Sequence, residues 1–171
     1  MLLKSRSSHV AFGGIFTALS VLFLLLSCVI PFGRLVFVFL TSAVVGVAVN
    51  MFDKRLAFFV YAATSLLSIF VVPDKSYAAL YVIVVGNYPL VKPLLEKIYS
   101  VPVCFALKLV CFNVYMVLCY IIAVKLLSIS FDLQYSIFIL WALMLAAFYV
   151  YDYAYSLFMQ KIYYAIPKNK F

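Results

Sequence analysis

Six long apolar runs, separated by short charged loops, constrain this chain more than any other feature of its sequence. The runs cover residues 10–30, 35–52, 56–72, 76–95, 103–127 and 133–158. A helix needs about 20 apolar residues to cross a bilayer core roughly 30 Å thick. We therefore predict an all-α, polytopic membrane bundle of six transmembrane helices, in which residues 1–171 form a single transmembrane domain.

The composition excludes a water-soluble domain. Hydrophobic residues make up 69% of the chain and charged residues 11%, against about 45–50% and about 25% in soluble domains. The formal net charge of +8 comes mostly from residues between the apolar runs, where positive charges set orientation and meet anionic lipid headgroups. We therefore expect the lipid bilayer, and no nucleic acid, as the partner of these charges.

Lysine and arginine are distributed unevenly between alternate loops. Arg34, Lys75 and Lys125 fall on one side, and nine fall on the other: Lys4, Arg6, Lys54, Arg55, Lys92, Lys97, Lys161, Lys168 and Lys170. Because cytoplasmic loops carry the excess of positive charge, we predict a multi-pass protein of the cell membrane with both termini in the cytoplasm. An even number of helices also places both termini on one side.

The fourth apolar run is interrupted by Pro89 and Pro93. Since proline lacks an amide hydrogen and clashes with the preceding turn, we expect this segment to be tilted, broken or re-entrant. Its last part, "NYPLVKPLLEK" at 87–97, spaces Lys92 and Glu96 as an i, i+4 pair. That part is either a short coupling-type helix near the inner surface or an ordinary connecting loop.

Small residues cluster on one face of the first predicted helix. Ala11, Gly14 and Ala18 lie at i, i+3 and i+7, and such residues let helix backbones approach closely in lipid. Their partner is either another helix of this chain or a helix of a separate subunit. Ser42 and Gly46 form a second small-residue stripe on the next helix.

Two ionisable residues, Lys108 and Asp152, lie inside predicted membrane helices. Charges in these positions usually face the bundle interior or water and pair with one another. We expect either a Lys108–Asp152 pair or two side chains that reach separately toward the headgroups. Tyrosines flank Asp152, so an interfacial aromatic belt is a further alternative for this residue.

A set of polar residues falls on the predicted outer side. These candidates for binding a small solute are Arg34, Asp74, Lys75, Tyr77, Asp132, Gln134 and Trp141. Arg34 suits a carboxylate or phosphate because its guanidinium can donate two parallel hydrogen bonds. Interfacial anchoring is the alternative role of each residue.

The sequence lacks the patterns of several enzyme classes. It has no GxxxxGK[ST] phosphate loop and no paired catalytic constellation. Its four cysteines and single histidine lack the spacing of a zinc site, so we expect four free thiols. We predict that the chain is not an enzyme and needs no cofactor or metal.

The organisation resembles the substrate-binding S component of energy-coupling factor (ECF) transporters. The shared features are six short membrane helices in 171 residues, cytoplasmic termini and a small-residue face on the first helix. In that family an Ala-x-x-x-Ala pattern docks onto a transmembrane T component, which ATPase subunits drive; here the pattern is Gly14-x-x-x-Ala18. The segments "IPF", "VPDK" and "YPLVKPLLE" are also similar to a small uncharacterised membrane family of Firmicutes.

This resemblance implies a membrane-embedded subunit that captures a small solute from the outer side and relies on partner subunits for ATP-driven transport. The alternative is a non-transport membrane scaffold or assembly protein of the cell envelope. A transporter subunit predicts an outward-opening cavity and an uncovered small-residue face. A scaffold predicts a closed bundle with polar contacts only at its ends.

Overall fold

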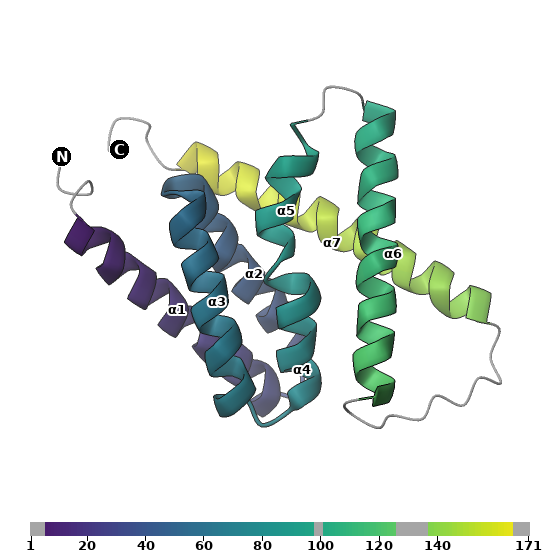
Figure 1. Cartoon of the computed structure of the whole chain (residues 1–171), viewed down its shortest axis with the longest axis horizontal. Coiled ribbons are helices and arrows are strands. Elements are labelled where there is room, and N and C mark those ends of the chain that lie inside the picture. The colour runs from purple at the N-terminus through teal and green to yellow at the C-terminus, as the bar shows by residue number, and fades with distance from the viewer. Residues whose placement is uncertain (1–5, 98–100, 126–136, 166–171) are drawn as a thin grey trace.

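The computed structural model describes residues 6–97, 101–125 and 137–165, which form helices and no strand (Figure 1). In chain order the elements are α1 (Arg6–Val29), α2 (Arg34–Met51), α3 (Lys54–Val71), α4 (Lys75–Leu80), the π-helical turn η2 (Tyr81–Val85), α5 (Tyr88–Leu95), α6 (Val101–Lys125) and α7 (Ile137–Ala165). Six segments of the described chain are long and apolar enough to cross a membrane, with α4, η2 and α5 together forming the fourth. The all-helical prediction is therefore confirmed for the described residues, and their six long apolar helices suggest a multi-pass membrane protein.

The first three helices form two tight hairpins, and proline and glycine residues determine where helices end and begin. α1 ends just before Pro31 and α3 just before Pro73, because a proline ring disfavours helical backbone in the residue before it. Gly33 precedes α2 with φ +79°, a left-handed conformation that glycine adopts without steric cost. α7 continues past the predicted end at Phe158 to Ala165.

The helix α2 lies at the centre of the molecule. It contacts α1, α3, η2, α5 and α7, and its middle turns, residues 41–46, are buried throughout. α7 crosses obliquely behind the bundle, and α6 stands to one side of it (Figure 1). The packing of α2 is possible because small residues such as Ser42, Ala43 and Gly46 occupy this stretch.

The fourth span is a broken helix. α4 passes into the π-helical turn, in which Gly86 N donates to Tyr81 O at 2.8 Å, and α5 starts after a turn at Gly86 and Asn87. Pro89 occupies the second position of α5, where a missing amide hydrogen costs no intrahelical bond. The predicted interruption is confirmed, and it lies just before Pro89.

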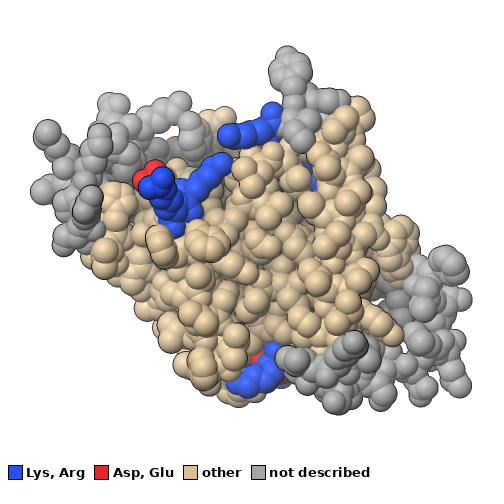
Figure 2. Space-filling view, viewed as in Figure 1, with Lys and Arg blue, Asp and Glu red and all other residues tan. Residues whose placement is uncertain are grey.

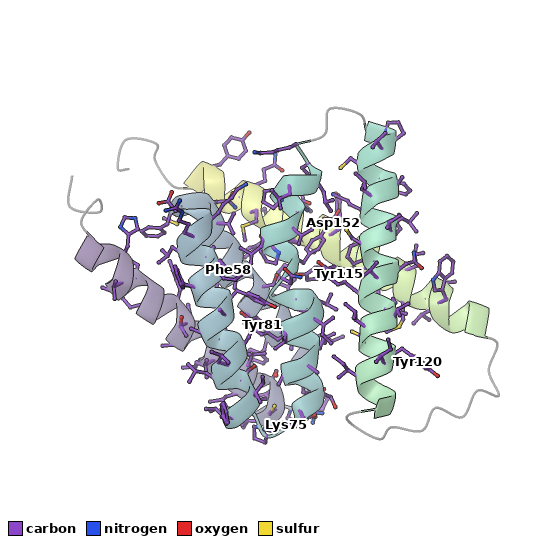
Figure 3. The ribbon with its side chains drawn as sticks, in the orientation of Figure 1. Phe58, Lys75, Tyr81, Tyr115, Tyr120 and Asp152 are labelled. Carbon is purple, nitrogen blue, oxygen red and sulfur yellow. The ribbon has the colours of Figure 1, made fainter. Side chains whose placement is uncertain are left out.

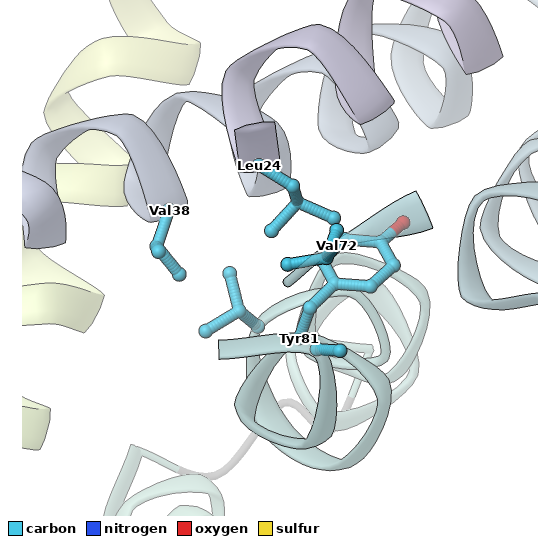
Figure 4. Close-up of a cluster of buried hydrophobic side chains, with 6 residues drawn as sticks. Leu24, Val38, Val72 and Tyr81 are labelled. Carbon is cyan, nitrogen blue, oxygen red and sulfur yellow. The ribbon is translucent and has the colours of Figure 1, made fainter. Parts of the chain in front are cut away.

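A hydrophobic core lies where α1, α2, α3 and the fourth span meet. Leu24, Val38, Val72 and Tyr81 converge there, together with Ala78 and Val85 (Figure 4). All six side chains are buried. This core fixes the lower half of the fourth span against the first three helices.

Charged side chains gather at two opposite ends of the visible face, with a broad uncharged band between them (Figure 2). The start of α1 and the late part of α7 both lie beside the end of α2. The His9 ring meets the Phe52 ring edge-on, with centroids 5.9 Å apart, and Asn50 Nδ2 lies 3.5 Å from Met159 Sδ. The described parts of the first and last helices therefore meet at the same end of the bundle.

Candidate functional site

A buried ion cluster joins α5, α6 and α7 around Asp152. The Asp152 carboxylate accepts hydrogen bonds from Tyr88 and Lys92 of α5, and from Lys108 Nζ of α6 at 2.9 Å. Glu96, at the end of α5, places its Oε1 3.1 Å from Lys108 Nζ and 3.6 Å from Lys92 Nζ. Figure 3 shows Asp152 near α5 and α6, toward the end opposite Lys75.

Lys92 is the most enclosed charge of this cluster. Its side chain is 6% exposed, against 45% for Glu96, and its ammonium group also donates to Ser156 Oγ. The same group lies over the rings of Tyr88 and Tyr155, at 5.7 and 5.1 Å from their centroids. Carboxylate, hydroxyl and aromatic faces together replace the water that this ammonium loses on burial.

The cluster holds two lysines and two carboxylates, so its formal charges balance. An unpaired charge inside a bilayer costs several kcal/mol, and removing one member of a buried pair exposes that cost. The arrangement therefore ties three helices together through one carboxylate.

Of the two arrangements predicted for Lys108 and Asp152, the structure has the pair. Of the two forms predicted for residues 87–97, a short helix or a connecting loop, the structure has the helix, Tyr88–Leu95, in which Lys92 and Leu95 are buried. This helix continues the fourth apolar span. The i, i+4 contact between Lys92 and Glu96 is present.

Sequence reasoning missed Tyr88, Lys92 and Ser156 as partners of Asp152. The available signal was the position of Lys92 in the apolar stretch "YPLVKPLL", where a lysine needs a counter-charge from another helix. Because the loop count included Lys92, its need for a counter-charge from another helix was not recognised.

The predicted outer residues lie in two places: Arg34, Asp74, Lys75 and Tyr77 lie at the starts of α2 and α4, and Trp141 lies on α7. Arg34 and Tyr77 come together, with Arg34 Nη1 3.4 Å from the Tyr77 hydroxyl and the guanidinium 6.0 Å from the ring centroid. Lys75 Nζ donates to the carbonyls of Ile69 and Val72, at 2.7 and 3.0 Å. Lys75 thus caps the end of α3, where carbonyl groups lack helical donors.

Asp74 and Trp141 also have local partners. Asp74 Oδ1 caps α4 by accepting from Ser76 N at 2.9 Å. Trp141 Nε1 donates to Asn113 Oδ1 at 3.1 Å, which links α7 to α6. The remaining outer candidates, Asp132 and Gln134, lie outside the described residues.

The small-residue face of α1 is uncovered in the described structure. Ala11, Gly14 and Ala18 are exposed, and a side chain at Gly14 would meet nothing within 4 Å. Gly14 and Ala18 line a groove of about 950 Å³ between α1 and α3, which Phe59 and Ala63 line from the α3 side. Ala11 lies outside this groove.

The second small-residue stripe is covered by α7. Ser42 Oγ lies 2.6 Å from the Tyr151 hydroxyl, and a Cβ at Gly46 would clash with Tyr155 and Met159. The two stripes therefore differ, because one packs within the chain and the other faces outward.

Comparisons with known proteins do not assign a family, since no protein-family model, curated protein or solved structure matches this chain.

Proposed function

We propose that this chain is the solute-binding membrane subunit of a multi-subunit transporter, and that it docks a partner's transmembrane helix against α1. The observation that carries the proposal is the open groove beside Gly14 and Ala18. In lipid there is little hydrophobic driving force for helix association, so helices associate through close packing. A small-residue face favours such packing because it lets another backbone approach closely. ATP hydrolysis would then reside in partner ATPase subunits, coupled through a transmembrane T component.

The charge distribution supports an orientation for this subunit. The described residues at the end where α1 begins include Lys54, Arg55 and Lys161, whereas the opposite end has Arg34 and Lys75. With the richer end in the cytoplasm, Arg34 and Tyr77 face outward and are the first groups that a solute meets. In this orientation both termini are cytoplasmic and the membrane is the cell membrane.

A membrane scaffold of the cell envelope is the second candidate. Capping and pairing by Lys75, Asp74 and Arg34 favour it, because these groups already serve the fold. A scaffold would use the same α1 groove for a partner of different function.

The partner decides between these candidates. We would place a photo-crosslinking residue at Ala18, in the groove, and at Ala106, an exposed alanine of α6, and identify adducts from native membranes by mass spectrometry. Adducts of a transport subunit at Ala18 alone, with ATPases co-purifying, support the transporter. Adducts of cell-wall synthesis proteins support the scaffold, and lipid adducts alone at both positions contradict docking.

A substitution sharpens the same test. Gly14→Leu adds bulk to the groove at a position where a Cβ meets nothing within 4 Å, so we expect partner capture to fall while the melting temperature of the isolated chain is not lowered. Ala106→Leu adds bulk on α6 and should leave capture intact. Equal capture by both variants would count against the α1 groove.

A further inference from the structure

The groove between α1 and α3 has a closely packed floor and uncovered walls. A Cβ on Gly13 would lie 3.1 Å from Leu56 Cδ1, so the two helices touch along the floor. The walls expose Gly14 from α1 and Phe59 from α3. Thr17 also lines the groove, but its hydroxyl donates to Gly13 O of its own helix at 2.8 Å. The groove therefore presents an apolar surface over most of its length.

One end of the groove is polar. His9, Asp53 and Arg55 line this mouth, where α3 begins. Asp53 and Arg55 are exposed, and neither forms an ion pair or a side-chain hydrogen bond with another described residue. Figure 2 shows an acidic side chain beside basic ones at this end of the molecule. The mouth thus offers a carboxylate and a guanidinium to a ligand.

The length of the groove matches one leaflet of a bilayer. Leu67, the last lining residue of α3, lies 14 residues after Asp53, and at a rise of 1.5 Å per residue this is about 21 Å. Half of a bilayer that is 40–45 Å thick with its headgroups is about 20–22 Å. A single phospholipid therefore fits the groove with its headgroup at the mouth and its acyl chains directed toward the midplane.

The two charges of the mouth select the headgroup. A guanidinium binds a phosphate through two parallel hydrogen bonds, and a carboxylate accepts from a primary ammonium. We propose that the α1–α3 groove binds one phosphatidylethanolamine molecule, with its phosphate on Arg55 and its ammonium on Asp53. Phosphatidylglycerol would leave Asp53 without a cation, and the quaternary ammonium of phosphatidylcholine has no N–H group to donate.

This inference goes beyond the proposed function. The lipid occupies the groove of the free subunit, and a partner helix that docks beside Gly14 would displace its acyl chain. Lipid binding therefore needs no partner, and it can be measured on the purified chain alone.

Thermal unfolding of the full chain in a neutral detergent tests the headgroup. Phosphatidylethanolamine, phosphatidylglycerol and phosphatidylcholine with identical acyl chains are added separately at the same mole fraction. A lipid that binds the folded chain raises its melting temperature. We expect the rise with phosphatidylethanolamine to be several-fold larger than with either other lipid. Equal rises with all three would overturn the proposal, because they would mean that any acyl chain fills the groove equally well.

Substitutions separate the two headgroup contacts. Asp53→Asn should abolish the preference for phosphatidylethanolamine over phosphatidylglycerol, because the ammonium loses its counter-charge. Arg55→Gln should reduce the rise with both lipids several-fold, because both carry a phosphate. Lys54→Gln is the matched control, since it removes the same charge from an exposed neighbour that does not line the groove. A preference that persists in Asp53→Asn, or equal losses in Arg55→Gln and Lys54→Gln, would overturn the proposal.

A phosphatidylethanolamine with a photoactivatable acyl chain locates the bound lipid. We expect adducts on peptides that contain Gly14 or Phe59 to exceed those on the peptide that contains Ala106 of α6 several-fold, and Gly14→Leu to reduce the excess. Adducts spread evenly over these peptides would contradict a site in the groove. Because these measurements use the purified chain, lipid binding and partner docking can fail independently of each other.

Discussion

The first three helices and the last three are held together by different chemistry. In the first group, buried polar residues are small and several bond within their own helix: Ser27 Oγ donates to Leu24 O at 2.7 Å and Thr41 Oγ1 to Phe37 O at 3.0 Å. These hydroxyls therefore need no hydrogen-bond acceptor on a neighbouring helix. Close backbone packing can therefore supply the contacts between helices.

The last three helices meet through long side chains. The ring centroids of Phe112 on α6 and Phe148 on α7 lie 4.6 Å apart. The Phe105 ring stacks on the Tyr149 ring with a centroid distance of 5.3 Å. Asp152 adds the ionic contacts that reach α5 and α6 at once.

The difference concerns how stability is distributed. In the first group the free energy of unfolding comes from many small contacts, so no single side chain should contribute most of it. In the second group Asp152 is the less exposed of the two carboxylates that pair with both lysines, so its loss leaves Glu96 alone against two positive charges. The two regions should therefore respond differently to single substitutions.

Asp152→Asn tests that asymmetry with the largest expected effect. Because the amide carries no charge, buried Lys92 loses its main counter-ion, and we expect a loss of about 3–5 kcal/mol in unfolding free energy. Reversible unfolding of the full chain in a denaturing detergent measures this loss.

Asp53→Asn is the matched control, since Asp53 is exposed before α3 and its side chain makes no capping bond. It should change stability little. The paired replacement Lys92→Met with Asp152→Leu should recover most of the loss, because it removes both charges together. Equal stability of the Asp152→Asn and Asp53→Asn variants would mean that the cluster does not hold the helices.

The sequence was sufficient for the helices because their signal is local. Apolar length and the prolines at 31 and 73 determine where α1 and α3 end. The same reasoning located the weak point of the fourth span, although it did not show that η2 absorbs the break.

The contacts between helices were only partly predictable. Lys108 and Asp152 attracted attention because each is a lone charge in an apolar run. The role of Lys92 depends on how α5 continues α4 through the turn at 86–87, which is a tertiary outcome. Likewise, Ser42-x-x-x-Gly46 and Gly14-x-x-x-Ala18 look alike in sequence, and only packing distinguishes the covered stripe from the open one.

A pair of glycine substitutions sharpens that distinction, with an intermediate effect. Gly46→Val should destabilise the isolated chain by about 1–3 kcal/mol through overpacking, since its Cβ would lie 2.8 Å from Met159 Cε and clash with Tyr155. Gly14→Val should be close to neutral because its surroundings are open. Unfolding in detergent measures both variants, and a larger loss for Gly14→Val would reverse the assignment of the two faces.

Trp141→Phe asks whether neutral contacts also matter at the α6–α7 contact, and its expected effect is the smallest. The ring volume is largely kept, but the hydrogen bond from Nε1 to Asn113 Oδ1 is lost, which should cost about 0.5–1.5 kcal/mol of unfolding free energy. Asn113→Ala removes the same bond from the other helix, so the double variant should cost less than the sum of the single changes. Additive effects would mean that the ions and aromatic rings alone join α6 to α7. If Trp141→Phe abolished solute binding while stability stayed unchanged, Trp141 would belong to the predicted outer binding site. A residue that only joins α6 to α7 would weaken binding by destabilising the fold.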